Sequence, residues 1–90
     1  MKALQPTTQY KKDLKKYKNN PKKLNALKVV LGMLRDELPI PAEYRPHMLS
    51  GEYKGCLECH IQGDFLLIWI DKQRDIIELV RIGSHSELFG

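Results

Sequence analysis

The chain has 90 residues, of which 42% are hydrophobic and 29% are charged, and its formal net charge is +4. This length predicts a single domain, residues 1–90, with a thin core. The chain has two cysteines, Cys56 and Cys59, which are too few and too close together to stabilise a secreted fold through disulfide bonds. This favours a reducing compartment. The N-terminus lacks the apolar stretch of a signal peptide, and no apolar run approaches the roughly 20 residues of a membrane span. The sequence therefore predicts a cytoplasmic protein outside the membrane.

The positive charge is concentrated in the first part of the chain. Residues 1–37 contain ten Lys and Arg against three Asp and Glu, a net +7, whereas residues 38–90 contain five against eight, a net −3. A localised basic charge suits a polyanionic partner. Two helices coated with solvated lysines explain the same charge equally well, so charge alone does not decide between the two interpretations.

The beginning of the chain predicts a short strand followed by an amphipathic helix. Residues 2–5 form the candidate strand. Thr7 or Thr8 is a suitable N-cap for a helix that ends at about Lys18. The apolar face of this helix repeats at i, i+4 and i+7, with most of the lysines opposite, and consists of Tyr10, Leu14 and Tyr17.

A second helix is predicted directly after the first. Asn20 is an N-cap residue, and Pro21 occupies the first helical position, where proline is favoured. The helix reaches about Glu37 and ends at residues 38–41 (LPIP), because proline cannot continue a helix and disfavours it one residue earlier. Its apolar seam consists of four leucines, Leu24, Leu27, Leu31 and Leu34.

The second half of the chain predicts a loop, three strands and a short tail. The strand at residues 65–70 (FLLIWI) is apolar throughout, as is typical of a strand covered on both faces. The connections are short, so the strands should form antiparallel hairpins. The fold class is therefore α+β, with the order β-α-α-β-β-β and two N-terminal helices packed on a small antiparallel sheet. The expected segments are a loop at 42–52, strands at 53–61, 65–70 and 76–82, turns at 62–64 and 71–75, and the tail His85–Gly90.

Three histidines lie in three separate segments: His47 in the loop, His60 at a strand end and His85 in the tail. Asp64 follows His60 across a tight turn, so we expect these two residues to be close. Histidine gives and takes protons near neutrality. Converging histidines therefore suit acid–base cleavage of a phosphodiester, in which one removes the proton of a ribose 2′-OH and another protonates the departing 5′-oxygen.

Two basic residues are candidates for holding the phosphate of such a substrate. Lys54 follows the loop, and Arg81 lies in the last strand. Either side chain would stabilise the charge that develops on the phosphate. For Arg81, a cross-strand ion pair with Glu78 or Glu58 is the alternative interpretation.

Residues 56–60 (CLECH) match the C-x-x-C-H signature of haem attachment. That attachment is made outside the cytoplasm, and residues three apart in a strand point to opposite faces. A zinc site at Cys56, Cys59, His60 and one more histidine would need the strand to break into a knuckle. We therefore expect neither haem nor metal here, and interpret both cysteines as small, half-buried strand residues.

Several landmarks recur in order along the second half of the chain. They are P-x-x-Y-x-x-H-x-L-x-G from Pro41 to Gly51, K-G at 54–55, E-x-H at 58–60 with an aspartate four residues later, and R-x-G-x-H-x-x-L-F from Arg81 to Phe89. Together they resemble the YafQ family of type II toxins in the RelE/ParE superfamily. The resemblance covers nearly the whole chain and is most specific from His47 to Phe89. It implies a microbial-RNase-like fold and a ribosome-dependent mRNA endonuclease that a co-expressed antitoxin holds inactive.

The resemblance also implies an active site that needs no metal or other cofactor and consists of His47, His60, Asp64 and His85. Phe65 fills the family's aromatic position after the aspartate, and Phe89 matches the aromatic of the tail and is expected to stack on a base or to pack the site. We expect His85 to be the general base and either His60 or His47 to be the general acid, with Asp64 orienting a histidine or tuning its charge. DNA lacks the 2′-OH and should not be cut.

The expected partners follow from the charge and the resemblance together. The lysine-rich helices should bind ribosomal RNA without sequence preference. An antitoxin should cover the same groove, formed by these helices, with an acidic segment that folds on contact. One alternative is a non-catalytic ParE-like toxin that inhibits gyrase, against which the three histidines argue. The other is a metal- or haem-binding protein built on residues 56–60.

Overall fold

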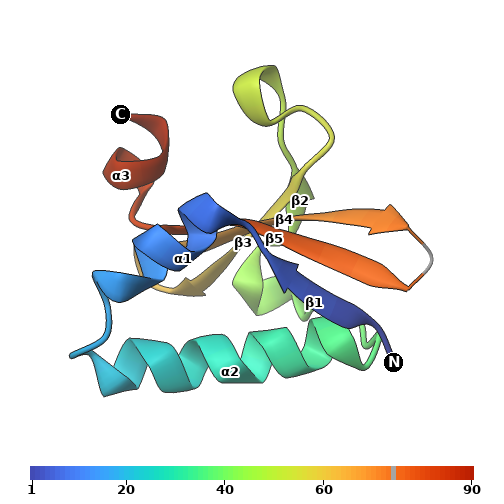
Figure 1. Ribbon diagram of the computed structural model, residues 1–90, viewed down its shortest axis with the longest axis horizontal. Helices are drawn as coiled ribbons and strands as arrows, with labels where there is room; N and C mark the ends of the chain where they lie inside the picture. The colour runs from blue at the N-terminus through green and yellow to red at the C-terminus, as the bar shows by residue number, and fades with distance from the viewer. Residues whose placement is uncertain (74) are drawn as a thin grey trace.

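The computed structural model describes residues 1–73 and 75–90 (Figure 1). None of the helices in these ranges is both long enough and apolar enough to cross a membrane. The elements in chain order are β1 (Ala3–Pro6), α1 (Thr8–Lys15), α2 (Pro21–Arg35), η1 (Ala42–Tyr44), β2 (His47–Met48), η2 (Gly51–Tyr53), β3 (Leu57–Gln62), β4 (Phe65–Gln73), β5 (Ile76–Gly83) and α3 (His85–Phe89), where η denotes a 3₁₀ turn.

The five strands form one sheet in the order β1-β5-β4-β3-β2. The pairs β3–β4 and β4–β5 are antiparallel, as expected, the pair β2–β3 is antiparallel too, and the α+β fold class is confirmed. Strand β1 differs, because it pairs parallel with β5 at the sheet edge. In Figure 1, α2 runs along one side of the sheet, while α3 and the segment carrying η2 rise on the other side.

Both N-terminal helices begin where their capping residues predict. The side chain of Thr7 accepts a hydrogen bond from the amide of Tyr10, and that of Asn20 accepts one from the amide of Lys23, with proline next in the chain. Each cap satisfies one of the amides that a helix start leaves without a partner. The helices end at Lys15 and Arg35, somewhat earlier than predicted, because hydrogen-bonded turns replace the last helical residues.

The sheet is covered on both faces, which explains the apolar run at residues 65–70. The main core lies between the two N-terminal helices and the sheet, and includes Tyr10, Leu27, Val30, Leu34, Cys59, Ile61, Phe65, Leu67, Trp69, Ile77, Leu79 and Ile82. A smaller cluster on the other face consists of Cys56, Leu66, Ile68 and Leu88. Because side chains alternate along a strand, β4 contributes in turn to both cores.

Three segments of the second half differ from the prediction. The loop at residues 42–52 contains β2 and the two 3₁₀ turns, and the next strand begins at Leu57, because Tyr53 belongs to η2. Strand β4 continues to Gln73, which shortens the charged turn; Arg74 of that turn lies outside the described residues. The tail is a helix started by a capping box, in which Ser84 and Glu87 satisfy each other's backbone amides. The S-x-x-E pattern was a readable signal for this helix.

Candidate active site

Two rows of cross-strand neighbours bring the candidate residues to the sheet face that carries α3. One row joins His60 through Leu66 to Gly83, from which α3 begins two residues later at His85. Neighbouring strands lie ~4.8 Å apart, so the backbones at the two ends of this row are separated by roughly 10 Å. The second row runs His47, Glu58, Ile68 and Arg81 across β2, β3, β4 and β5.

His47 and His60 lie side by side on this face. Their ring centroids are 6.2 Å apart. The Nδ1 atom of His47 lies 2.8 Å from the carbonyl oxygen of Arg45, and its Nε2 atom lies 3.1 Å from Oε1 of Glu58. The carbonyl oxygen of Arg45 can only accept, so Nδ1 of His47 donates the hydrogen in that contact. A hydrogen bond between Nε2 and Oε1 of Glu58 needs one further proton, on either the imidazole or the carboxylate. Both ring nitrogens of His47 are therefore engaged by the protein.

Glu58 is a site residue that the sequence interpretation missed. It is only 4% exposed, and within residues 1–73 and 75–90 its Oε2 atom has no hydrogen-bond partner. A buried carboxylate is costly unless it is paired, so its contact with His47 is the main compensation within the protein. The E-x-H pattern carried the signal, since residues two apart in a strand share a face.

Asp64 contacts His85 through the main chain. Its Oδ1 atom accepts a hydrogen bond of 2.9 Å from the amide of His85, the first residue of α3. The His85 ring lies 4.9 Å from the Phe89 ring, which in turn makes an edge contact of 5.7 Å with Tyr53 in η2. Asp64 thus holds the start of α3, while aromatic packing sets the direction of the His85 side chain.

The guanidinium group of Arg81 is occupied by other protein groups. Its Nε and Nη2 atoms donate to Asp13 of α1 at 2.7 and 3.1 Å, and Nη1 donates to the hydroxyl of Tyr53 at 3.0 Å. The hydrogen bond to Asp13 raises the pKa of Arg81 further above its ordinary value. The ion-pair partner is therefore Asp13 of a helix, rather than Glu78 or Glu58 of the sheet.

Three more residues were predicted to contact the substrate; Phe65 is buried, whereas Phe89 and Lys54 are exposed. Phe65 is 0% exposed and packs in the main core, with its ring centroid 4.6 Å from that of Tyr17, so the prediction that it binds substrate is wrong. The register of β4 turns it toward the helices, away from the histidines. Phe89 is 40% exposed beside His85, and Lys54 is exposed at the end of η2, so both side chains remain accessible on the candidate face.

The two cysteines are buried, at 8% exposure for Cys56 and 0% for Cys59. Burial raises the pKa of the Cys59 thiol to about 12. Over the ranges that the structure describes, no group of three or more His, Cys, Asp or Glu is arranged to hold a metal ion. Both side chains act as small apolar residues that pack against the sheet.

Comparison with known proteins identifies the family of the chain. Residues 2–90 match the family described as a bacterial toxin of type II toxin-antitoxin system, YafQ. The chain is 38% identical over 85 residues to the mRNA interferase toxin YafQ of Escherichia coli K12, which covers 91% of this chain and 89% of the relative. The fold is that of a type II toxin. The chain belongs to the YafQ family, as the sequence landmarks predicted.

Two solved structures show how closely the fold is shared. The E. coli DinJ-YafQ complex contains a chain with a TM-score of 0.85 and 31% identity, with both chains covered completely. A metal-bound toxin from Helicobacter pylori gives a TM-score of 0.86 and 40% identity, covering 99% of this chain and 100% of that one.

Proposed function

We propose that this toxin is a cytoplasmic endoribonuclease that cleaves mRNA on the ribosome through attack by the substrate's own 2′-OH. The observation that carries the proposal is the convergence of His47, His60 and the start of α3 at His85 on one sheet face. Because the nucleophile belongs to the substrate, the reaction needs proton transfer and charge stabilisation, and no metal. The relatives' description as mRNA interferases supports the same substrate.

The geometry supports different roles for the three histidines. His85 is exposed at the start of α3 and acts as the general base on the 2′-OH. His60 acts as the general acid on the departing 5′-oxygen, because both nitrogens of His47 are engaged by Arg45 and Glu58. His47, held by Arg45 and Glu58, then lies beside His60 and positions the phosphate with its exposed ring.

The remaining side chains support these three. Lys54, exposed at the end of η2, meets the phosphate. Arg81 positions Tyr53, against which Phe89 packs, and Phe89 offers its exposed ring to a base. Asp64 keeps His85 in place through the amide of that residue.

A translation extract programmed with a defined mRNA tests this function, with cuts mapped by primer extension. His85→Ala should lower the cleavage rate by roughly 10²- to 10⁴-fold, the usual contribution of a general base. Ser86→Ala, at the next exposed position of the same helix, is the matched control and should cleave normally. An mRNA with a 2′-deoxy nucleotide at the cut site should stay intact.

Three results of this assay would contradict the proposal. Normal cleavage by His85→Ala would show that His85 is not the general base. Cleavage of the 2′-deoxy substrate would show that the 2′-OH is not the nucleophile. Loss of cleavage in EDTA, restored by a divalent metal, would show that the reaction needs a metal ion. Intact mRNA together with inhibited DNA gyrase would instead support the ParE-like alternative.

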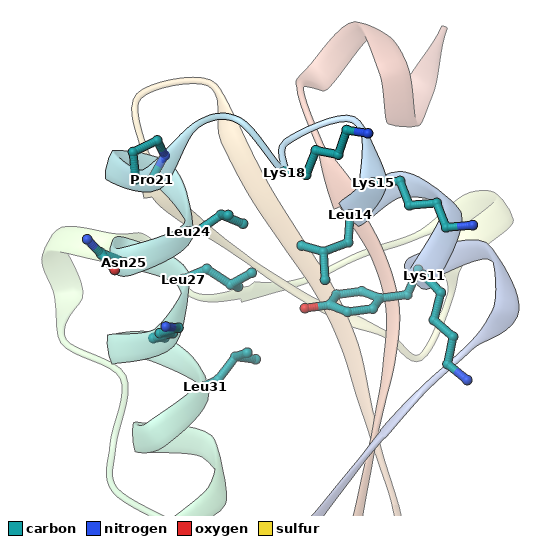
Figure 2. A pocket seen from close by; sticks show the side chains of 11 residues that line it. Lys11, Leu14, Lys15, Lys18, Pro21, Leu24, Asn25, Leu27 and Leu31 are labelled. Carbon is teal, nitrogen blue, oxygen red and sulfur yellow. The ribbon is translucent and has the colours of Figure 1, made fainter.

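The proposed inhibitory partner is a co-expressed antitoxin that docks an acidic amphipathic segment between α1 and α2. A groove of about 670 Å³ lies there, with an apolar floor formed mainly by leucines of both helices. Lysines surround it, and Figure 2 shows Lys11, Lys15 and Lys18 along one side of the leucines. An amphipathic helix buries its apolar face in such a groove, and acidic flanks match the lysines. Without the antitoxin, the same lysines would contact ribosomal RNA.

Charge reversal tests this docking surface. Lys15→Glu with Lys18→Glu changes two residues that line the groove, while Lys12→Glu with Lys22→Glu changes the net charge equally at exposed positions outside it. The first pair should weaken binding of the purified antitoxin by roughly tenfold or more in calorimetry, and the second pair much less. Equal weakening by both pairs would show that only overall charge matters, and would contradict the docking site.

A further inference from the structure

A second cavity adjoins His60 on the side away from β4. It has a volume of about 340 Å³ and lies between η1 and the end of β3, and its walls are Glu43, Tyr44, Arg45, His60, Ile61, Gln62 and Gly63. This volume falls in the range of small-ligand sites. The proton transfers proposed for His60 and His85 do not involve this cavity.

The walls of the cavity present hydrogen-bonding groups of both kinds. Glu43 brings a carboxylate, Arg45 a guanidinium, and Gln62 an amide that both donates and accepts. Tyr44, half-buried against the main core, adds an aromatic ring. Proteins read single-stranded RNA with such a set, stacking an unpaired base on an aromatic or guanidinium plane and hydrogen-bonding its edge.

Arg45 connects this cavity to the active site through its backbone. Its φ of 50° lies in the left-handed region, which is uncommon for residues other than glycine. In this conformation its carbonyl oxygen accepts the hydrogen bond from Nδ1 of His47, while its side chain lines the cavity beside His60. One residue therefore holds a histidine and borders the space where a neighbouring nucleotide would lie.

We propose that this cavity is a specificity subsite for the RNA base on the 3′ side of the cut, read by Arg45 and Gln62. The inference rests on the proposed function, in which His60 protonates the departing 5′-oxygen. That oxygen belongs to the nucleotide 3′ of the cut, so its base lies beside His60. The cavity is the adjoining space with groups that can distinguish one base edge from another.

The test maps cut sites across many translated mRNAs for the natural chain and two variants, Arg45→Gly and Gln62→Ala. Glycine is chosen at position 45 because it adopts a positive φ without strain, so the carbonyl contact with His47 is kept. Arg35→Ala is the matched control, because Arg35 is an exposed arginine at the end of α2. Circular dichroism and thermal unfolding check that each variant is folded.

Loss of one bidentate contact relaxes base discrimination by roughly tenfold or more. We therefore expect the preference at the nucleotide 3′ of the cut to weaken by that factor in Arg45→Gly and Gln62→Ala. The preference on the 5′ side should not change, and Arg35→Ala should match the natural chain. A slower reaction with unchanged preferences, or relaxation only on the 5′ side, would overturn the subsite while leaving the ribonuclease intact. No cleavage by the natural chain would instead overturn the proposed function.

Discussion

Asp13 fixes α1 to the strand that leads into the active site, so its removal should destabilise the protein strongly. The carboxylate is 3% exposed and accepts four hydrogen bonds: 2.7 and 3.1 Å from Arg81, 3.0 Å from Gln9 and 3.2 Å from the amide of Ile82. Asp13→Asn keeps the shape of the side chain but removes its charge. It also places an amide NH₂ group against the N–H groups that donate to Asp13. Breaking a buried ion pair on one side costs about 3–5 kcal/mol. Because Arg81 keeps 19% exposure, we expect about 3 kcal/mol, or roughly 150-fold in the unfolding equilibrium.

Urea unfolding at neutral pH measures this change. Asp36→Asn is the control, because Asp36 pairs with Arg35 on the exposed end of α2 and its loss should leave the midpoint unchanged. A cost below about 1 kcal/mol for Asp13→Asn would refute the reasoning, since it would mean that water already screens the pair.

The same variant should lose its effect in acid. Burial by itself raises the pKa of Asp13, but hydrogen bonds from Arg81, Gln9 and the Ile82 amide outweigh it and hold the pKa below its ordinary 3.8. A carboxyl with a lowered native pKa stabilises the fold above the unfolded value and loses that contribution as the pH falls through the native value. The gap in unfolding free energy between the natural chain and Asp13→Asn should therefore be full at neutral pH and close below pH 3.8. A gap that persists in strong acid would show that the charge is not its cause.

Three further changes have defined outcomes. Gly83 has a φ of 155°, which side chains rarely adopt, and a Cβ there would lie 2.8 Å from Oε1 of Glu87, the atom that accepts from the Ser84 amide, so Gly83→Ala should strain the start of α3 and lower mRNA cleavage while the protein stays folded; loss of the folded state in thermal unfolding would contradict a local effect. A hydrogen bond from the Ser84 backbone lowers the pKa of Glu87, so the stability gained over Glu87→Gln should disappear as the pH falls below the ordinary value of 4.5. Burial raises the pKa of Cys59 to about 12, so iodoacetamide at neutral pH should leave it unmodified by mass spectrometry until urea is added; rapid native labelling would contradict its burial.

Local signals were sufficient for the elements with strong caps or turns. Thr7, Asn20 and Pro21 placed the two helix starts correctly, because a helix end is decided by groups within one turn of the chain. The apolar run at residues 65–70 predicted coverage on both faces, and both faces are covered. The tail helix was missed although its capping residues Ser84 and Glu87 stand in the sequence.

Pairing between distant segments was not predictable in the same way. Strand β1 joins β5 more than 70 residues away, and nothing near residues 3–6 indicates that the pairing is parallel. Arg81 could be assigned to the phosphate or to a sheet carboxylate from the sequence, but its partner is Asp13, 68 residues earlier. Phe65 matched a family position, yet its face depends on the β3–β4 register, in which it pairs with Gln62.

The uneven charge of the sequence has a structural explanation in these contacts. The carboxylates near the candidate site are paired with other groups of the protein. Glu58 contacts His47, Asp64 accepts from the amide that starts α3, and Asp13 binds Arg81. The lysines of α1 and α2 are mostly exposed, and several line the apolar groove between these helices. Acidic groups therefore hold the residues of the candidate site in place, and the exposed surface of α1 and α2 is strongly basic. In the proposed function, RNA and an acidic antitoxin are attracted by the same excess of lysines. We therefore expect these two partners to compete without a conformational change in the toxin.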